Sequence, residues 1–195
     1  MIEDCTALVI AGGESRRMGC DKARLLLGDQ TLLQRVILVM QQVFPRVLVS
    51  VREHRPEINL AQIRDAPGDA GPLAGLCAGL AQSRDDWVFA VATDMPFIQP
   101  ALIERLAQRR ADCQAVVPVV HGHPQALAAF YSASGLPIIQ GILSGTGKRS
   151  LRAALLQLKV HYVAESELPA AELRSFIDLD TPQDVARARQ SEESV

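Results

Sequence analysis

Short runs of apolar and β-branched residues alternate along this chain with segments of helical periodicity, and this alternation is what most restricts the fold. The runs cover residues 7–11, 47–51, 87–92, 115–119 and 126–131. Such runs predict strands, whereas apolar residues repeated at intervals of three and four predict helices. Strands that alternate with helices form a mostly parallel sheet with helices on its faces. We therefore expect an α/β, Rossmann-like fold.

The helical segments have recognisable starts. Residues 31–43 begin with a capping threonine and end before Pro45, as expected of a crossover helix between the first two parallel strands. Further helices are predicted to start at Gly71-Pro72, at Gln99-Pro100 (running to about residue 110) and at Thr181-Pro182, with a frayed tail after Gln190. A long helical region is expected over residues 136–159. No linker divides the 195 residues, which are 48% hydrophobic, so we expect one domain.

A loop rich in glycine and positive charge follows the first predicted strand. From position 10 it reads I-A-G-G-E-S-R-R-M-G-C-D-K. Its glycines allow a tight turn and let backbone N–H groups approach an anion, while two arginines and Lys22 add positive charge. The residue types predict a site for a nucleoside triphosphate.

Two better-known phosphate loops do not fit this pattern. A P-loop requires Gly-Lys followed by Ser or Thr, but Gly19 is followed by Cys20. The dinucleotide fingerprint would need glycine in place of Glu14 and Arg17, which argues against a nicotinamide or flavin dehydrogenase. The similar segment 145–149 lacks the required hydroxyl and is expected to be a turn before a helix.

Acidic residues are expected at the same edge of the sheet. Asp94 follows the most hydrophobic predicted strand, and Asp65 begins the loop that leads into G-P-L-A-G. Ligands of open α/β sheets bind at the carboxyl ends of the strands, so the loops after Ile10, Ile63 and Ala92 should converge. Mg²⁺ often takes only one or two protein carboxylates, and Asp94 is the first candidate ligand.

The loop after Ile10, the segment T-D-M-P-F and the segment G-P-L-A-G resemble the nucleotidyltransferases related to molybdenum cofactor guanylyltransferase. The resemblance extends over most of the chain. It implies transfer of GMP from GTP to molybdenum-bound molybdopterin, with release of pyrophosphate and with Mg²⁺ as cofactor. It also implies nucleotide binding by about residues 1–119, acceptor binding by about 120–190, and transient contacts with proteins that make the cofactor or chaperone molybdoenzymes.

The resemblance also assigns roles to individual residues of this sequence. Transition-state charge is expected to be stabilised by Lys22, Arg17 and Asp94. The nucleotide is expected to contact Ile10, Ala11, Gly12, Gly13, Lys22, Ser50, Asp65 and Asp94. Ser50 departs from the asparagine that the family often has at this position. A hydroxyl can still donate one hydrogen bond there.

Alternatives remain open from the sequence. Asp178 and Asp180 stand where guanylyltransferases often have asparagine and cytidylyltransferase relatives have aspartate, whereas Gly13 is typical of the guanine users. Asp180 is either a second Mg²⁺ ligand beside Asp94 or only the entry to the last helix. Cytidylyl transfer is therefore the nearest alternative. An alternative of another class is a protein that binds GTP or the cofactor without catalysis.

Charge and cysteine usage restrict the partners. Twenty basic and 22 acidic residues give a net charge of −2, which offers no broad basic face for nucleic acid or anionic lipid. The start of the chain is acidic, and no apolar run approaches the length that spans a membrane, so we expect a cytoplasmic protein. The four cysteines form no C-x-x-C pair and are expected to be reduced and mostly buried.

Overall fold

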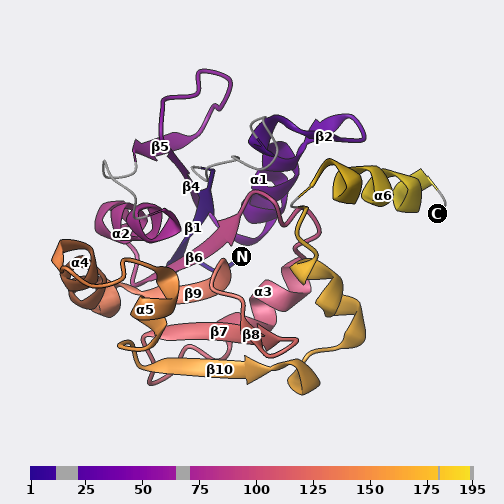
Figure 1. The fold of residues 1–195 in the computed structure, drawn as a ribbon. Helices are drawn as coiled ribbons and strands as arrows, with labels where there is room; N and C mark the ends of the chain where they lie inside the picture. The colour runs from indigo at the N-terminus through magenta and orange to yellow at the C-terminus, as the bar shows by residue number, and fades with distance from the viewer. Residues whose placement is uncertain (12–21, 65–70, 180, 194–195) are drawn as a thin grey trace.

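The computed structural model describes residues 1–11, 22–64, 71–179 and 181–193, with an eight-stranded sheet at the centre (Figure 1). The strand order is β10-β7-β9-β6-β1-β4-β5, and β8 pairs with β7. The strands are β1 (Cys5–Ile10), β4 (Arg46–Val51), β5 (Ala61–Arg64), β6 (Trp87–Ala92), β7 (Ala115–Val120), β8 (His123–Pro124), β9 (Ala128–Ser132) and β10 (Val160–Ala164). A separate small hairpin contains β2 (Leu26–Leu27) and β3 (Gln30–Thr31).

Most neighbouring long strands are parallel. β1 lies parallel to β4 and β6, β4 to β5, and β7 to β10, whereas β9 is antiparallel to both β6 and β7. The carboxyl ends of β1, β4, β5 and β6 therefore open at one edge. The predicted α/β fold with a mostly parallel sheet is confirmed.

Helices cover both faces of this sheet. They are α1 (Leu32–Val43), α2 (Pro72–Gln82), α3 (Pro100–Ala107), α4 (Leu136–Ser144), α5 (Leu151–Leu155) and α6 (Pro182–Glu193), with 3₁₀ turns η1 (Lys22–Arg24), η2 (Ala133–Gly135), η3 (Glu165–Glu167) and η4 (Ala170–Phe176). In Figure 1, α2, α4 and α5 lie together on one side of the strands, and α1 and α3 lie on the other. No helix among the described residues is long and apolar enough to cross a membrane.

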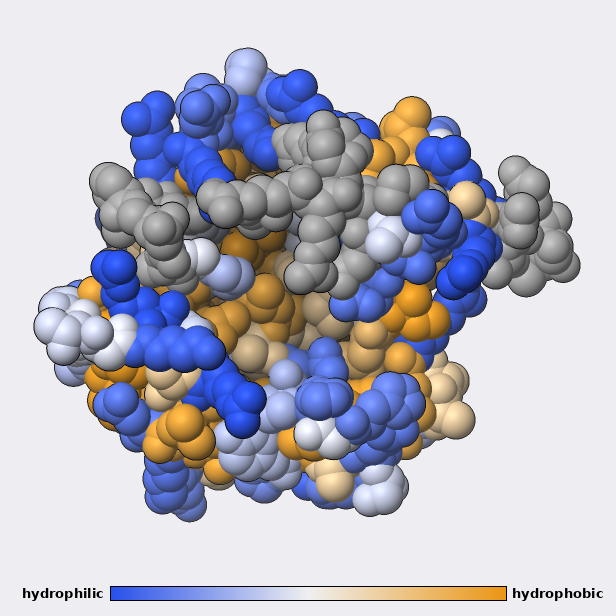
Figure 2. Space-filling view, in the orientation of Figure 1, coloured by the Kyte–Doolittle hydropathy of each residue, from blue (hydrophilic) through white to orange (hydrophobic). Residues whose placement is uncertain are grey.

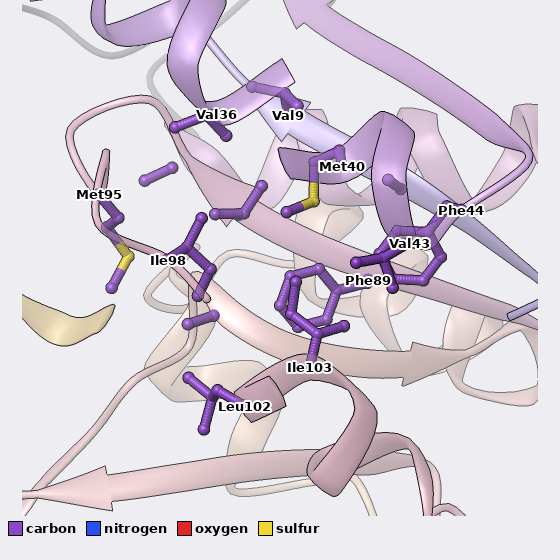
Figure 3. Close-up of a cluster of buried hydrophobic side chains, with 14 of the residues drawn as sticks. Val9, Val36, Met40, Val43, Phe44, Phe89, Met95, Ile98, Leu102 and Ile103 are labelled. Atoms are coloured by element: carbon purple, nitrogen blue, oxygen red, sulfur yellow. The ribbon is translucent and has the colours of Figure 1, made fainter. Parts of the chain in front are cut away.

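The two hydrophobic cores follow from the alternation of side chains along each strand. Val9 and Phe89 face α1 and α3, whereas their neighbours Leu8 and Val88 face α2 and α4. Figure 3 shows the first core, in which Met40 of α1 and Ile103 of α3 lie around Phe89. The helices on each face therefore bury their apolar side chains against the same sheet.

Several local predictions are confirmed. Helix α1 forms the predicted crossover between the parallel strands β1 and β4. Thr31 caps it: the Thr31 hydroxyl accepts the Gln34 N–H at 3.1 Å, and the Gln34 side chain accepts the Thr31 N–H at 2.8 Å. Residues 145–149 form a turn before a helix, as predicted, and Ser150 caps α5 through the Ala153 N–H.

The predicted helical region over 136–159 is wrong in its extent. It contains two helices, α4 and α5, because the glycine-rich turn at 145–149 is a poor helix former and Ser150 starts a new helix. The chain then forms the unpredicted β10, an edge strand in which only Val163 is buried, so its hydrophobic pattern is weak. Helix α3 ends at Ala107 rather than near 110, and α6 continues to Glu193 past the predicted fray.

Candidate nucleotide-binding site

Lys22 and Asp94 lie side by side at the carboxyl edge of the sheet. The Lys22 ammonium is 3.1 Å from Asp94 Oδ2, although 72 positions separate the two residues in the sequence. Their side chains are 20% and 25% exposed. The ion pair is therefore partly buried, and both of its side chains still reach solvent.

The loop after β6 fixes Asp94 through its buried neighbours. Met95 and Ile98 are 5% and 3% exposed, and both belong to the core drawn in Figure 3. The Met95 N–H donates to the Ala92 carbonyl at 3.4 Å, and the Ile98 N–H donates to the Met95 carbonyl at 3.3 Å. The strand end and these anchors together hold Asp94 in a tight turn at the sheet edge.

Lys22 is fixed by a different set of contacts. It begins η1, in which Ala23 is 2% exposed, and its carbonyl accepts the Leu25 N–H at 3.0 Å. The Leu25 carbonyl in turn accepts the Leu32 N–H at 2.8 Å, at the start of α1. The segment that carries Lys22 is therefore tied to the helix that packs on the sheet.

The end of β1 carries two predicted nucleotide contacts. Ile10 and Ala11 are 4% and 7% exposed, and the Ala11 N–H donates to the Ser50 carbonyl at 2.9 Å. Ser50 pairs with Ile10 in the β1–β4 register and is fully buried. The structure thus brings Ile10, Ala11 and Ser50 to one place, and their contact with a nucleotide stays a prediction.

Other predicted site residues lie outside the described residues. These are Gly12, Gly13, Arg17, Asp65 and Asp180, together with Cys20 of the glycine-rich loop. Their predicted roles are not tested. The flanking residues are described: Arg64 ends β5 at the edge where β4 ends, and Gly71, with a φ of +52°, leads into α2 at G-P-L-A-G.

The C-terminal segment contributes a contact that sequence reasoning missed. The Leu179 N–H donates to the Asp94 carbonyl at 2.9 Å, which brings residues 177–179 against the loop after β6. A groove of ≈ 390 Å³ opens there, lined by Phe97, Arg174, Ile177, Asp178, Leu179, Asp184, Arg187 and Ala188. A contact made by the Leu179 main chain cannot be inferred from the residue type at that position. The neighbouring Asp178 and Asp180 were the only sequence signal that this segment belongs near the site.

The donor set fits a hard cation that keeps most of its own ligands. Asp94 supplies carboxylate oxygens at the sheet edge, and no group of three or more His, Cys, Asp or Glu side chains gathers among the described residues. Mg²⁺ is compatible with this arrangement, because it retains waters and takes phosphate oxygens from the substrate. A structural zinc site would need four closely placed ligands.

The surface around this edge combines polar and apolar character. Figure 2 shows hydrophobic residues gathered at the centre of a hollowed face, bordered by hydrophilic ones. Lys148, Arg149 and Arg152 are exposed around α5. Cys5, Cys77 and Cys113 are free thiols, and burial raises the pKa of each, so at neutral pH they stay protonated.

Comparison with known proteins agrees with this geometry. Residues 7–161 match a family model described as a MobA-like NTP transferase domain. A relative from Pelotomaculum thermopropionicum, named probable molybdenum cofactor guanylyltransferase, is 34% identical over 94% of this chain and 91% of its own. One of the same name from Opitutus terrae is 38% identical over 93% of each chain.

The fold is also similar to that of a solved structure. The molybdopterin-guanine dinucleotide biosynthesis protein A from Archaeoglobus fulgidus superposes with a TM-score of 0.83 and 26% identity, over 97% of this chain and 100% of that one. By the family model that matches residues 7–161 and by its identity to these relatives, the chain belongs to the MobA-like NTP transferase family.

Proposed function

We propose that this protein transfers GMP from GTP to molybdenum-bound molybdopterin and releases pyrophosphate, giving the guanine dinucleotide form of the cofactor. The contact between Lys22 and Asp94, 3.1 Å long, is the observation that carries the proposal. It places one cation and one carboxylate where the glycine-rich segment leaves β1. The names of the relatives support the choice of GTP and of the acceptor.

The proposed chemistry depends on positioning and charge. An acceptor phosphate oxygen, already deprotonated at neutral pH, attacks the α-phosphorus of GTP in line with the departing pyrophosphate. Lys22, Arg17 and N–H groups of the loop from Ile10 to Gly13 stabilise the negative charge that develops on the leaving group. Ser50 and Asp65 are proposed to contact the nucleotide. Such a site needs neither a general base nor a covalent intermediate.

Asp94 is proposed to hold Mg²⁺, with Asp180 as a second candidate ligand. The bound ion supplies charge neutralisation at the phosphates. With Mg²⁺ on Asp94, the Lys22 ammonium would turn toward the phosphate oxygens, since its flexible side chain carries three donors. In this proposal Asp94 pairs with the Lys22 ammonium when no substrate is bound and with Mg²⁺ when substrate is bound.

Residues of about 120–190 are proposed to bind the acceptor. The groove beside Asp94 supports this assignment, because Arg174 and Arg187 line it and can meet a phosphate. The exposed Lys148, Arg149 and Arg152 are further candidates. Transient contact with cofactor-synthesis proteins or molybdoenzyme chaperones, and a cytoplasmic location, stay predictions.

Turnover of the purified protein with Mg²⁺, acceptor and each of GTP, CTP and ATP tests the proposal, with mass analysis of the product. We expect the GMP adduct and pyrophosphate. Preference for CTP would instead favour the cytidylyltransferase alternative suggested by Asp178 and Asp180. Saturable GTP binding without pyrophosphate release would favour a non-catalytic binding protein.

Substitution of the paired residues tests their roles. Lys22→Ala and Asp94→Asn should each lower the transfer rate at least about a hundredfold while leaving the fold intact, as loss of one charge-stabilising group does elsewhere. Arg84→Ala and Asp86→Asn are matched controls, since both side chains are exposed and lie outside the proposed site. Unchanged turnover in either site variant would contradict the assignment.

A further inference from the structure

The C-terminal helix packs against the hairpin that follows Lys22. A small buried cluster joins them, made of Leu27, Leu32, Leu179, Val185 and Ala188. Figure 1 shows α6 beside β2, apart from the helices that cover the large sheet. The cluster therefore connects the last segment of the chain with a segment near its beginning.

Arg189 adds a polar contact to this cluster. Its Nη2 donates to the Leu26 carbonyl at 2.7 Å, and its Nε approaches the same oxygen at 3.3 Å. Leu26 lies on β2, directly after the turn in which the Leu25 N–H binds the Lys22 carbonyl. A guanidinium can hold one oxygen with two N–H groups, which fixes direction as well as distance.

These contacts form a closed circuit around the site. Lys22 binds Asp94, the Asp94 carbonyl accepts the Leu179 N–H, and Leu179 packs with α6 against the hairpin. Arg189 then returns from α6 to Leu26, near Lys22. Each member restrains the position of the next, so the circuit adds to the contacts with α1 that hold the Lys22 segment near Asp94.

We propose that Arg189 is a positioning residue, which holds the β2–β3 hairpin so that Lys22 faces Asp94 and the triphosphate. The proposal rests on the proposed transfer reaction for its kinetic consequence. Arg189 touches no substrate in this account. It acts through the Leu26 carbonyl and the η1 turn.

Kinetics with Arg189→Ala test the proposal. Loss of one charge-assisted contact that orients a reacting group should lower kcat about tenfold with little change in KM for GTP. Arg189→Lys should recover part of the loss, because an ammonium can still donate to the Leu26 carbonyl. Arg84→Ala removes an exposed arginine from the segment before β6, outside the proposed site, and should leave kcat unchanged. A kcat of Arg189→Ala equal to that of the native protein would overturn the proposal.

A double-mutant cycle asks whether Arg189 acts through Lys22. In the Lys22→Ala background, Arg189→Ala should have almost no further effect on the residual rate, since two residues that act on one group are not additive. A full additional tenfold loss would show that Arg189 acts elsewhere and would contradict the proposal.

Hydrogen exchange gives a readout that does not depend on turnover. Arg189→Ala should speed exchange of the amides in residues 22–32 without changing exchange in β1 or β6, as local opening of a small unit does. Unchanged protection of this segment would refute the positioning role. Faster exchange in a protein whose native form shows no transfer would leave the positioning role standing and refute the proposed function alone.

Discussion

At the scale of single residues, a second polar cluster lies at the opposite end of the sheet from the site. Asp85 accepts hydrogen bonds from the Thr6 hydroxyl at 2.5 Å and from Arg46 Nε at 2.7 Å, and Ser83 Oγ donates to Thr6 Oγ1 at 3.1 Å. Thr6 is 2% exposed. Burial raises the pKa of Asp85, but the hydrogen bonds from Arg46 and Thr6 outweigh it, so the pKa is lowered overall.

Asp85→Asn should therefore lower the free energy of unfolding by about 2 kcal/mol at neutral pH, because it removes the charge from these bonds while keeping the shape. Urea titration measures the change. Asp86→Asn is the neighbouring exposed control and should change stability little. Equal stability of Asp85→Asn and the native protein would show that the ion pair with the half-exposed Arg46 contributes nothing net.

The same carboxylate predicts a pH dependence. Its folded pKa lies below the unfolded value, so its stabilisation is present above the unfolded pKa and is lost as the pH falls through the folded one. The stability difference between the native protein and Asp85→Asn should then shrink below about pH 4. A difference that stays constant from neutral to acid pH would contradict this assignment.

The order of predicted strands and loops placed Lys22 and Asp94 at the same edge, since the loops that carry them follow strands whose carboxyl ends lie there. Arg189 could not be predicted in the same way. Its side chain binds a main-chain carbonyl, and because every residue has such a carbonyl, no residue type marks the partner in the sequence. Its partner is fixed by how α6 packs against the β2–β3 hairpin, a tertiary contact that local patterns do not determine.

At the scale of elements, helix α2 approaches the sheet closely at Gly79. A Cβ at this position would overlap Leu8 Cδ2 and lie 2.9 Å from Leu8 Cδ1. Leu8 is fully buried in β1, so it has little room to move. Glycine at position 79 is therefore required by the contact of α2 with β1, the strand that precedes the glycine-rich loop in the sequence.

Gly79→Ala should lower the free energy of unfolding by about 1–3 kcal/mol, since overpacking costs more than the gain in helix propensity. Thermal and urea unfolding measure it. Gly141→Ala is the matched control, because a Cβ there meets nothing within 4 Å, and it should stabilise α4 by up to about 1 kcal/mol. A stabilised Gly79→Ala would mean that α2 does not contact Leu8 as described.

The elements that the sequence predicted well are those with a strong single signal. Helix α1 has its capping box and β6 has its continuous apolar run, and both were found within a residue of the expected bounds. β10 was missed because an edge strand with half-exposed residues looks like a loop or a helix end. Its pairing with β7, a tertiary contact, decides its conformation.

At the scale of the whole molecule, β9 and β10 build the two parts of the chain into one sheet. β9 comes from the proposed acceptor part, yet it lies between β6 and β7 and pairs with Trp87 through Val91 of the proposed nucleotide part. The ring centroids of Phe89 and Phe130 are 4.8 Å apart across this pairing, and those of Phe44 and Phe89 are 5.7 Å apart. The reversal that inserts β9 was not visible in the sequence, because strand direction depends on distant pairing.

A shared sheet and shared cores predict that both parts unfold together. Trp87 is the one tryptophan of the sequence and lies on β6, so its fluorescence reports the junction with β9, whereas far-UV circular dichroism reports all the helices, including α4 and α5. The two signals should give the same urea midpoint and the same slope, as expected for one cooperative transition. Separate midpoints would mean that residues near 120–190 unfold on their own. That outcome would show that the β6–β9 pairing is too weak to keep the proposed acceptor and nucleotide sites in a fixed position relative to each other.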